Sequence, residues 1–428
     1  MKLKTCVSLI LTLALSVSLA ACGSSPAPAP SGPSPASSTP GTPGTSGEKV
    51  TIELWHYFPD ANVAAFDKII DDFNSSQDRI EVKTTFVARA DLMKQYAMGA
   101  ISGELPDIGM TDSPDMASFV EMGIFEDITD LAGSWGELDQ FLPGPLSSCK
   151  GKDGKLYGLP QNANDLGFFY NKDLLKAAGY ENPPQTWEEL SQMCEELAKQ
   201  GVFGLGLSLQ STENATFQFY PFLYGAGGSI EEVNSPAGVK ALTLISELYQ
   251  KGYISPETIN WAQSDVVQSF IAGKTAMVVS GPWNVPTIQG ANVSFEWGAC
   301  EIPMDKQRAS VIGGENLGIC KGTEHKEEAF EVLSYIMGAQ ANADYAEAAG
   351  RFPVRQDSYS LKSVWTDDPL YSVFAEIMNY AVARGPHPEW SSLSEALYSN
   401  IQASVLGEKT PEQALNDAAA VITPLFAK

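Results

Sequence analysis

The chain has 428 residues, and its 52 acidic and 27 basic residues give a formal net charge of −25. This excess of negative charge argues against nucleic acid as a partner and against electrostatic docking on an anionic lipid surface. The three histidines, His56, His325 and His387, are not spaced as a metal-binding motif. The sequence also has no Gly-x-Ser-x-Gly motif and no phosphate-binding loop, so we expect neither a metal nor a cofactor.

The first residues predict an export signal. Lys2 and Lys4 precede an apolar run at 7–20, which is too short for a lasting membrane span. The run ends in LAACG (19–23), which resembles the bacterial lipobox. This resemblance implies a signal peptide of residues 1–21, acyl chains such as palmitate on Cys22, and a lipid-anchored protein on the extracellular face of the cytoplasmic membrane. The alternative is an ordinary secretory signal with a chance cysteine near the cleavage point.

A linker is expected next. Residues 22–47 are almost wholly Gly, Ser, Pro, Ala and Thr, and they carry no charge. Such a segment cannot bury apolar area, so we expect it to be disordered, with extended character at its Pro-Ala-Pro stretches. Its 26 residues would reach about 80 Å at ~3.1 Å per residue. That reach suits a body that moves relative to the membrane or clears a wall layer.

From Glu48 onward the composition is typical of a globular protein, with no second apolar run long enough to span a bilayer. This part has about 380 residues, which exceeds what one core usually supports, so two lobes are expected. The predicted elements alternate between strands and helices, which indicates an α/β fold.

The elements follow from apolar periodicity and helix-end signals. Thr186 and Glu189 form a capping box that predicts a helix start, and Gly252 and Gly273 predict helix ends. Strands are predicted at 50–55, 80–87, 107–110, 202–209, 275–279, 295–302 and 317–320. Helices are predicted at 62–74, 91–102, 236–251, 266–272 and 327–337, and the chain from Pro369 is expected to be mostly helical.

Without Cys6 in the signal and Cys22 at the anchor, four cysteines remain, and none has C-x-x-C spacing. Cys194 falls on the apolar face of a predicted helix and is expected in the core. Cys300 and Cys320 fall in two predicted strands and could pair if those strands are neighbours. The sequence leaves a disulfide at this or any other pair open.

Several motifs resemble, in order, the family 1 extracellular solute-binding proteins of ABC importers, which include the maltose- and glycerol-phosphate-binding proteins. The most specific block joins FYNKDLL (169–175) to PPQTWEEL (183–190). The other motifs are IELWHY (52–57), GKDGKLYGLP (151–160), FIAGKTAM (270–277), GPW (281–283) and GGENLGI (313–319). The match covers essentially all of the chain from Glu48 to Lys428.

The resemblance implies a two-lobed, periplasmic-binding-protein-like (type II) α/β fold with the ligand cleft between the lobes. We expect the first lobe at 48–162 plus 303–350 and the second at 163–302 plus 351–428. It further implies a monomer that binds a carbohydrate, a di- or oligosaccharide, without catalysis and delivers it to the transmembrane permease subunits of the importer. The lobes are expected to close by rocking about the chain crossings.

Candidate ligand-binding residues were sought at strand ends, where open α/β sheets place their ligands. Sugars are held by aromatic rings and by polar groups that fix their hydroxyls. Trp55 and His56 follow the first predicted strand, and Asp112 ends a short one. Gly314 permits close approach of the backbone, and Glu315 is an acceptor for hydroxyls. The set is completed by Trp283 after a Gly-Pro turn, by Asn164 and Arg351 at the crossings, and by Tyr224.

Two other classes of protein stay open at this stage. The many carboxylates permit an exported glycoside hydrolase, which needs only two acids flanking the scissile bond. A sensory or adhesive carbohydrate-binding lipoprotein would need no permease. The sequence does not identify the sugar, its length, the affinity or the particular permease.

Overall fold

The computed structural model describes residues 49–58 and 61–427. The predicted signal peptide, Cys22 and the linker at 22–47 lie outside the described residues. Within the described ranges, no helix combines the length and the apolar character that a membrane crossing requires.

The first lobe is built on a five-stranded sheet in the order β2-β1-β3-β11-β4. Its strands are β1 (Val50–His56), β2 (Ile80–Phe86), β3 (Ile108–Asp112), β4 (Leu159–Pro160) and β11 (Glu315–Ile319). β1 runs parallel to β2 and β3, whereas β11 runs antiparallel to β3. As a result, the end of β3 and the start of β11 share one edge, where Asp112 and Glu315 are register partners.

The helices of the first lobe cover this sheet. They are α1 (Ala61–Ser76), α2 (Arg89–Ser102), α3 (Met116–Glu121), α4 (Thr129–Trp135), α5 (Pro143–Ser147), α12 (Lys326–Ile336), α13 (Ala339–Ala348), α14 (Gln356–Tyr359) and α15 (Val364–Asp367), with a 3-10 turn at Leu138–Gln140. On α1, Phe66, Ile69, Ile70 and Phe73 are buried. Their spacing puts them on one helix face, which packs with Ile52 and Leu54 of β1 in the core.

The second lobe is built on a four-stranded sheet in the order β7-β8-β6-β9. Its strands are β6 (Gly167–Asn171), β7 (Phe203–Gly206), β8 (Thr275–Ser280) and β9 (Trp297–Cys300). Both faces are covered: Phe168 packs in one core and its neighbour Phe169 in the other, since successive strand residues point to opposite faces.

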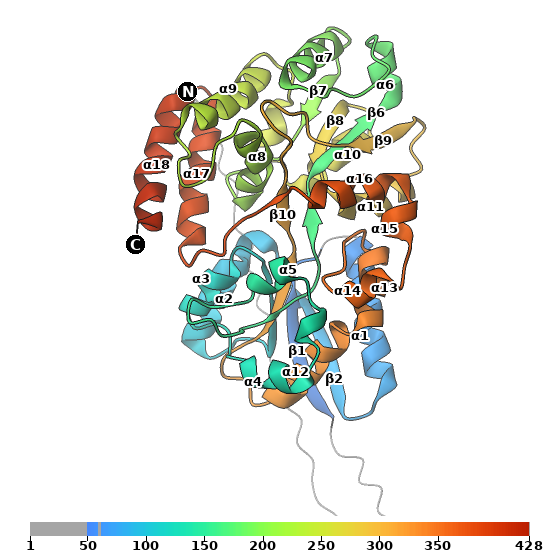
Figure 1. Cartoon of the computed structure of the whole chain (residues 1–428), viewed down its shortest axis with the longest axis vertical. Coiled ribbons are helices and arrows are strands. Elements are labelled where there is room, and N and C mark those ends of the chain that lie inside the picture. Colours follow the sequence, from blue (N-terminus) through green and yellow to red (C-terminus); the bar gives the residue numbers. More distant parts are fainter. Residues whose placement is uncertain (1–48, 59–60, 428) are drawn as a thin grey trace, which may run out of the picture. The chain divides into compact units, whose positions relative to one another are not determined.

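The helices of the second lobe are α6 (Lys172–Ala177), α7 (Trp187–Lys199), α8 (Glu213–Gly225), α9 (Pro236–Gln250), α10 (Gln263–Ile271), α11 (Val285–Gly290), α16 (Pro369–Met378), α17 (Trp390–Val405) and α18 (Pro411–Phe426), with 3-10 turns at Pro256–Ile259 and Pro282–Asn284. In Figure 1, α17 and α18 lie side by side and α9 packs near them. The predicted capping box is confirmed, because Thr186 and Glu189 bond each other's backbone at the start of α7.

A three-stranded crossing sheet, in the order β12-β10-β5, joins the lobes. Its strands are β5 (Asn164–Asp165), β10 (Val311–Gly313) and β12 (Val382–Ala383). β5 and β10 come from segments where the chain passes from one lobe to the other, whereas β12 lies between α16 and α17 of the second lobe. Figure 1 shows β10 in the middle of the folded unit. Asn164 pairs with Gly313 and Asp165 with Ile312.

The contacts of two segments favour chain crossings later than those expected from the sequence. Met304 N donates to Gln185 O at 2.9 Å, which holds this segment on the second lobe. Arg355 Nη1 donates to Met337 O at 3.0 Å, and α14 packs on α13, so this stretch stays with the first lobe. We propose that the first lobe resumes at β11 rather than at 303, and ends after α15 rather than at 350.

The condition for a pairing of Cys300 with Cys320, that their strands are neighbours, is not met. Cys300 ends β9 in the four-stranded sheet, whereas Cys320 follows β11 in the five-stranded sheet of the other lobe. Cys149, Cys194, Cys300 and Cys320 are all free thiols. Cys194 is buried on α7 in the core of the second lobe, as expected from its helical position.

Candidate ligand-binding cleft

A cavity of about 240 Å³ lies between the two lobes, against the crossing sheet. Its walls come from the strand ends of the first lobe, from helix starts of the second lobe, and from the crossings. The lining residues are Tyr57, Phe58, Asn62, Arg89, Asp112, Asn164, Asn214, Phe217, Ala262, Gln263, Ser264, Trp283, Asn284, Thr287, Gly314, Glu315, Arg351 and Arg384.

The sheet of the first lobe supplies the polar edge of the cavity. Tyr57 directly follows β1, Asp112 ends β3 and Glu315 begins the antiparallel β11, so all three meet at one edge. The Tyr57 hydroxyl is buried and has no hydrogen-bond partner among the described residues, 49–58 and 61–427. Burial, with the nearby carboxylates of Glu315 and Asp112, raises the pKa of Tyr57 well above its usual value. The neutral hydroxyl is therefore available to a ligand.

Another wall of the cavity consists of two stacked aromatic rings with a guanidinium group at each end. Arg384 Cζ lies 4.2 Å from the ring centroid of Phe217 on α8. The Phe217 and Trp283 rings are stacked with their centroids 6.3 Å apart, and Arg351 Cζ lies 4.9 Å from the Trp283 ring centroid. These cation–π contacts fix the rings without covering the whole wall, because all four residues still line the cavity.

Arg351 is held by groups from three parts of the chain. Its Nε donates to Asn62 Oδ1 at 3.4 Å, and its Nη2 lies 3.8 Å from Glu315 Oε1. The Asn164 amide is satisfied with its oxygen toward Arg351, where it accepts from Arg351 Nη1 at 2.7 Å and from Gly314 N at 3.2 Å. Arg351 is therefore a pre-oriented donor with its charge balanced by Glu315.

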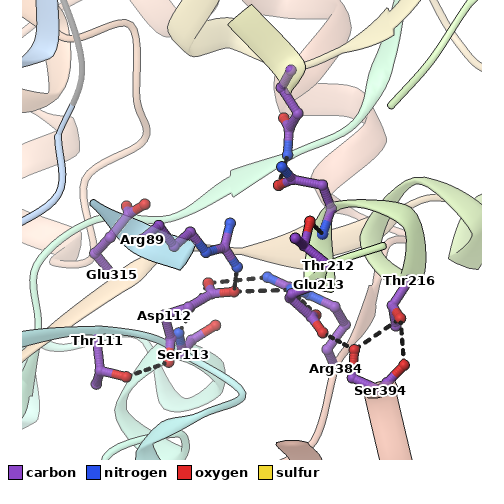
Figure 2. Close-up of polar contacts among 12 residues, drawn as sticks. Arg89, Thr111, Asp112, Ser113, Thr212, Glu213, Thr216, Glu315, Arg384 and Ser394 are labelled. Carbon is purple, nitrogen blue, oxygen red and sulfur yellow. Dashed lines mark hydrogen bonds and ion pairs between the residues drawn. The ribbon is translucent and has the colours of Figure 1, made fainter. Parts of the chain in front are cut away.

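Asp112 is the centre of a second charged group. Arg384 donates to both of its carboxylate oxygens, at 3.0 and 3.1 Å, and Arg89 donates to Oδ2. Figure 2 shows both guanidinium groups pointing at Asp112, with Glu213 on the other side of Arg384. Although burial acts in the opposite direction, Arg384 and Arg89 hold the pKa of Asp112 below its usual value. The carboxylate is therefore ionised and paired.

The structure brings six of the nine predicted site residues together in the cavity wall: Asp112, Asn164, Trp283, Gly314, Glu315 and Arg351. Gly314 has φ +148°, and a Cβ there would lie 2.2 Å from Asn162 O. The close approach that this glycine permits is thus between two crossing segments of the chain. Ligand contact by the six residues stays a prediction.

Trp55 and His56, which we proposed from the sequence, lie outside the cavity. Trp55 stacks on Tyr96 with ring centroids 5.7 Å apart, and its indole N–H donates to Glu53 at 3.0 Å. His56 is buried among the rings of Phe58, Phe66 and Phe86, and this burial lowers its pKa although Asp67 acts in the opposite direction. The strand ends at His56, so the cavity is reached one residue later, at Tyr57.

Tyr224 also lies away from the cavity. It is near the C-terminal end of α8, and its ring packs on Tyr220 with centroids 5.3 Å apart. The cavity receives Asn214 and Phe217 from the first turns of the same helix. Ten residues of helix separate Asn214 from Tyr224, which corresponds to about 15 Å.

The sequence interpretation missed the basic side of the cavity. The candidates from the sequence are mainly aromatic, polar and acidic residues, whereas three arginines line the cavity: Arg89, Arg351 and Arg384. Only Arg351 was a candidate. Arg89 lies just before the predicted helix at 91–102. Because a cation is unfavourable at the start of a helix, this position is a signal that could have drawn attention to Arg89. Arg384 carries no local signal.

The part of the chain that the structure describes contains no group of three or more His, Cys, Asp or Glu residues that could hold a metal ion. The side chains that line the cavity offer ring stacking, hydrogen bonds to hydroxyls and paired charges. Such a set recognises a small polar molecule with apolar C–H faces.

The two α/β lobes, the crossing sheet and the cavity between them define a solute-binding protein. Residues 68–373 match the family model of the bacterial extracellular solute-binding proteins, and the chain belongs to this family. The family assignment made from the ordered motifs is confirmed, and so is the two-lobed α/β fold.

Individual relatives agree with this assignment. The galactooligosaccharide-binding protein of Bacillus subtilis (strain 168) is 23% identical over 430 residues, covering 97% of this chain and 96% of the relative. The multiple sugar-binding protein of Streptococcus mutans serotype c is 26% identical over 324 residues, covering 71% and 74%. A solved ABC transporter solute-binding protein of Thermotoga lettingae TMO, bound with α-D-tagatose, has 28% identity and a TM-score of 0.82, covering 88% of this chain and 100% of that one.

Proposed function

We propose that this protein is the extracellular substrate-binding lipoprotein of an ABC importer, and that it binds a carbohydrate in the cleft without changing it. The observation that carries the proposal is the cavity wall, in which Trp283 and Phe217 present aromatic surface beside the paired polar groups of Asp112, Glu315 and Arg351. Aromatic faces suit the C–H surfaces of a sugar, and the polar groups suit its hydroxyls. Family membership and the sugar-binding relatives support the same function.

The charges of the cavity favour a neutral sugar over a polyol phosphate. Asp112 pairs with Arg384 and Arg89, and Arg351 faces Glu315. An anionic phosphate would have to compete with these carboxylates for the same guanidinium groups. A neutral sugar can instead accept from the remaining N–H groups and donate to the carboxylates.

The size of the cavity favours the short end of the expected ligands. Its volume of about 240 Å³ lies just below the range of roughly 300–1,000 Å³ that is usual for small-molecule sites. A monosaccharide or disaccharide fits this space better than a long oligosaccharide. The tagatose-bound structure of the Thermotoga lettingae relative is consistent with a small sugar.

Delivery would follow from closure of the lobes about the crossing sheet. A ligand that contacts both lobes favours the closed state by its differential affinity. The closed monomer then presents both lobes to the transmembrane permease subunits, while acyl chains on Cys22 keep it at the extracellular face of the membrane. A dissociation constant near 1 μM, or about −8 kcal/mol, suits capture with release.

The test is a thermal-shift screen of the purified protein against mono-, di- and oligosaccharides, followed by calorimetry on the hits. We expect stoichiometric binding of a small sugar with a raised Tm and no product. Hydrolysis of a bound oligosaccharide would instead establish a glycoside hydrolase. Binding with no loss of sugar uptake when the protein's gene is deleted would favour a sensory or adhesive role. Mass spectrometry of the membrane-bound form tests acylation of Cys22.

A further inference from the structure

One cluster of charged residues extends beyond the cavity and joins the two lobes. Asp112 and Arg89 belong to the first lobe, at the end of β3 and the start of α2. Glu213 begins α8 of the second lobe. Arg384 follows β12 of the crossing sheet and packs over Phe217 of α8, so it stays with the second lobe. Figure 2 shows the cluster with Arg384 between the two carboxylates.

Arg384 makes its contacts in two directions. It donates two hydrogen bonds to Asp112 on the first lobe and one from Nη1 to Glu213 on the second lobe. Paired donors to one carboxylate fix both distance and orientation, which a single point charge cannot do. The contact with Asp112 therefore requires the two lobes to be close together in this one arrangement.

Burial makes these contacts energetically relevant. The side chains of Arg384, Asp112 and Glu213 are only 1%, 5% and 15% exposed. Ion pairs on the surface contribute little, but buried ones are barely screened, and removing one partner leaves an uncompensated charge. Opening the cleft would expose Arg384 and Asp112 to water separately, so the pair contributes to the balance between open and closed states.

The carboxylate of Glu213 is itself held in place by a residue outside the cavity. The hydroxyl of Ser394 on α17 donates to Glu213 Oε2, and Ser394 Oγ also lies 2.8 Å from Thr216 Oγ1. Neither Glu213 nor Ser394 lines the cavity, whereas Arg384, Asp112 and Arg89 do. The cluster therefore extends from residues that line the cavity to residues that lie outside it.

We propose that Glu213 and Arg384 form an interlobe latch, in which Glu213 positions Arg384 to hold Asp112 of the opposite lobe. The latch sets how far the cleft is closed before any ligand binds. Glu213 is a positioning residue: it acts through Arg384 and touches no ligand. Its loss weakens the binding of every ligand by the same factor, because each ligand must then supply more of the closure itself.

The experiment compares the full-length protein with Glu213→Gln and Ser394→Ala, two residues outside the cavity. The matched control is Glu331→Gln, which removes a carboxylate that accepts two hydrogen bonds from Arg79 at 2.6 and 2.7 Å on the first lobe alone. Hydrogen exchange of the unliganded proteins is followed by mass spectrometry at 112–119 and at 213–217. The latch predicts severalfold faster exchange at both facing edges in Glu213→Gln, a smaller change in Ser394→Ala, and none in the control.

The second part of the experiment measures sugar binding and rests on the proposed carbohydrate function. We expect the Kd of Glu213→Gln to rise about tenfold for every sugar that binds, which is about 1.4 kcal/mol, with unchanged selectivity. Faster exchange confined to 213–217, or weaker binding of one sugar alone, would overturn the latch. If the wild type binds no sugar and Glu213→Gln still speeds exchange at both edges, the latch holds and the carbohydrate proposal falls.

Discussion

The guanidinium group of Arg351 lies over the ring of Trp283, with Cζ 4.9 Å from the ring centroid. Arg351 bonds Asn62 and faces Glu315 of the first lobe, whereas Trp283 lies on the second lobe, in the 3-10 turn after β8. This contact therefore bridges the cleft. It presents the ring to the cavity in a fixed orientation, beside Phe217, before a ligand arrives.

Replacement of Trp283 should therefore weaken binding strongly. Trp283→Ala removes the ring and its stacking surface, and we expect an affinity loss of about 10- to 100-fold, since stacking and burial together contribute roughly 1.4–2.8 kcal/mol. The measurement is calorimetry with the best sugar from the screen, well below the Tm of the variant. Trp55→Ala is the control, because Trp55 lies outside the cavity. An equal loss in both variants would count against a ligand role for Trp283.

Tyr57→Phe removes a single hydroxyl that has no hydrogen-bond partner in the part of the chain that the structure describes. Tyr57→Phe should leave the free energy of unfolding within about 0.5 kcal/mol of the wild type. The affinity should fall by about 3- to 10-fold as one ligand hydrogen bond of roughly 0.5–1.5 kcal/mol is lost. Tyr220→Phe is the matched control, since its hydroxyl is also buried without a partner but lies outside the cavity. Unchanged affinity in Tyr57→Phe would remove Tyr57 from the site.

The elements that the sequence predicted well depend on local patterns. The capping box at Thr186 and Glu189, and the apolar face of α1, are each determined by residues within one or two helical turns. Asp112 was also found, because it follows a predicted buried strand, and Glu315 was found as an acceptor after the Gly313-Gly314 pair, although β11 begins at Glu315 and not at 317. Both lie at the edge where open α/β sheets place ligands.

The features that could not be predicted from the sequence depend on contacts between residues that are far apart along the chain. Arg384 and Asp112 are 272 positions apart, and nothing near Arg384 marks it as the partner of a cleft carboxylate. The choice of His56 over Tyr57 failed for a different reason. Alternation of side chains along β1 decides which aromatic faces the core, and the point where the strand ends decides which one reaches the cavity.

Gly314 should tolerate no side chain. Its φ of +148° is accessible essentially to glycine alone, and a Cβ would lie 2.2 Å from Asn162 O. Gly314→Ala should lower the free energy of unfolding by at least about 2 kcal/mol, from backbone strain of roughly 1–3 kcal/mol and displacement of the neighbouring crossing segment. Urea denaturation followed by circular dichroism measures this. Gly133→Ala, at a position with nothing within 4 Å, is the control, and equal stability of the two variants would contradict the strain.

Asp165 should make stability depend on pH. It lies in β5 of the crossing sheet, and neither of its carboxyl oxygens has a hydrogen-bond partner within the described ranges. Burial raises its pKa well above the usual value, so the protonated form stabilises the fold. This contribution is complete below the unfolded-state pKa of about 3.9 and is lost as the pH rises toward the folded-state pKa.

Asp165→Asn removes this titration and keeps the shape of the side chain. Its free energy of unfolding should exceed that of the wild type at pH 8 by about 1–3 kcal/mol, the cost of a buried unpaired group, and by less at pH 5. Urea titrations at the two pH values measure the difference. A wild-type protein whose extra instability does not grow between pH 5 and pH 8 would show that Asp165 is not protonated in the fold.

Asp115 should make ligand binding depend on pH. It is the N-cap residue of α3, and the charges that act on it are those of Glu213 of α8, Asp112 of β3, Arg89 and Arg384, while it acts in turn on Tyr57 after β1. Burial, together with Glu213 and Asp112, raises the pKa of Asp115 to about 8. Three carboxyl groups then share two guanidinium groups, and a proton on Asp115 balances the charge. Because Glu213 approaches from the other lobe, this proton favours the closed cleft.

The direction in which sugar affinity changes with pH follows from the direction in which the pKa of Asp115 is shifted. A pKa raised on closure means that closure takes up a proton, so sugar affinity should fall as the pH rises toward 8 and level off above it. Asp115→Asn stays neutral at every pH, and its affinity should depend less on pH between 6 and 9 than that of the wild type. Its affinity at pH 9 should be equal to or higher than that of the wild type, while burial also raises the pKa of Glu213 in the same cluster. Calorimetry at four pH values across this range provides the comparison. A wild-type affinity that rises with pH would show that closure releases protons, and that Asp115 is ionised in the closed cleft.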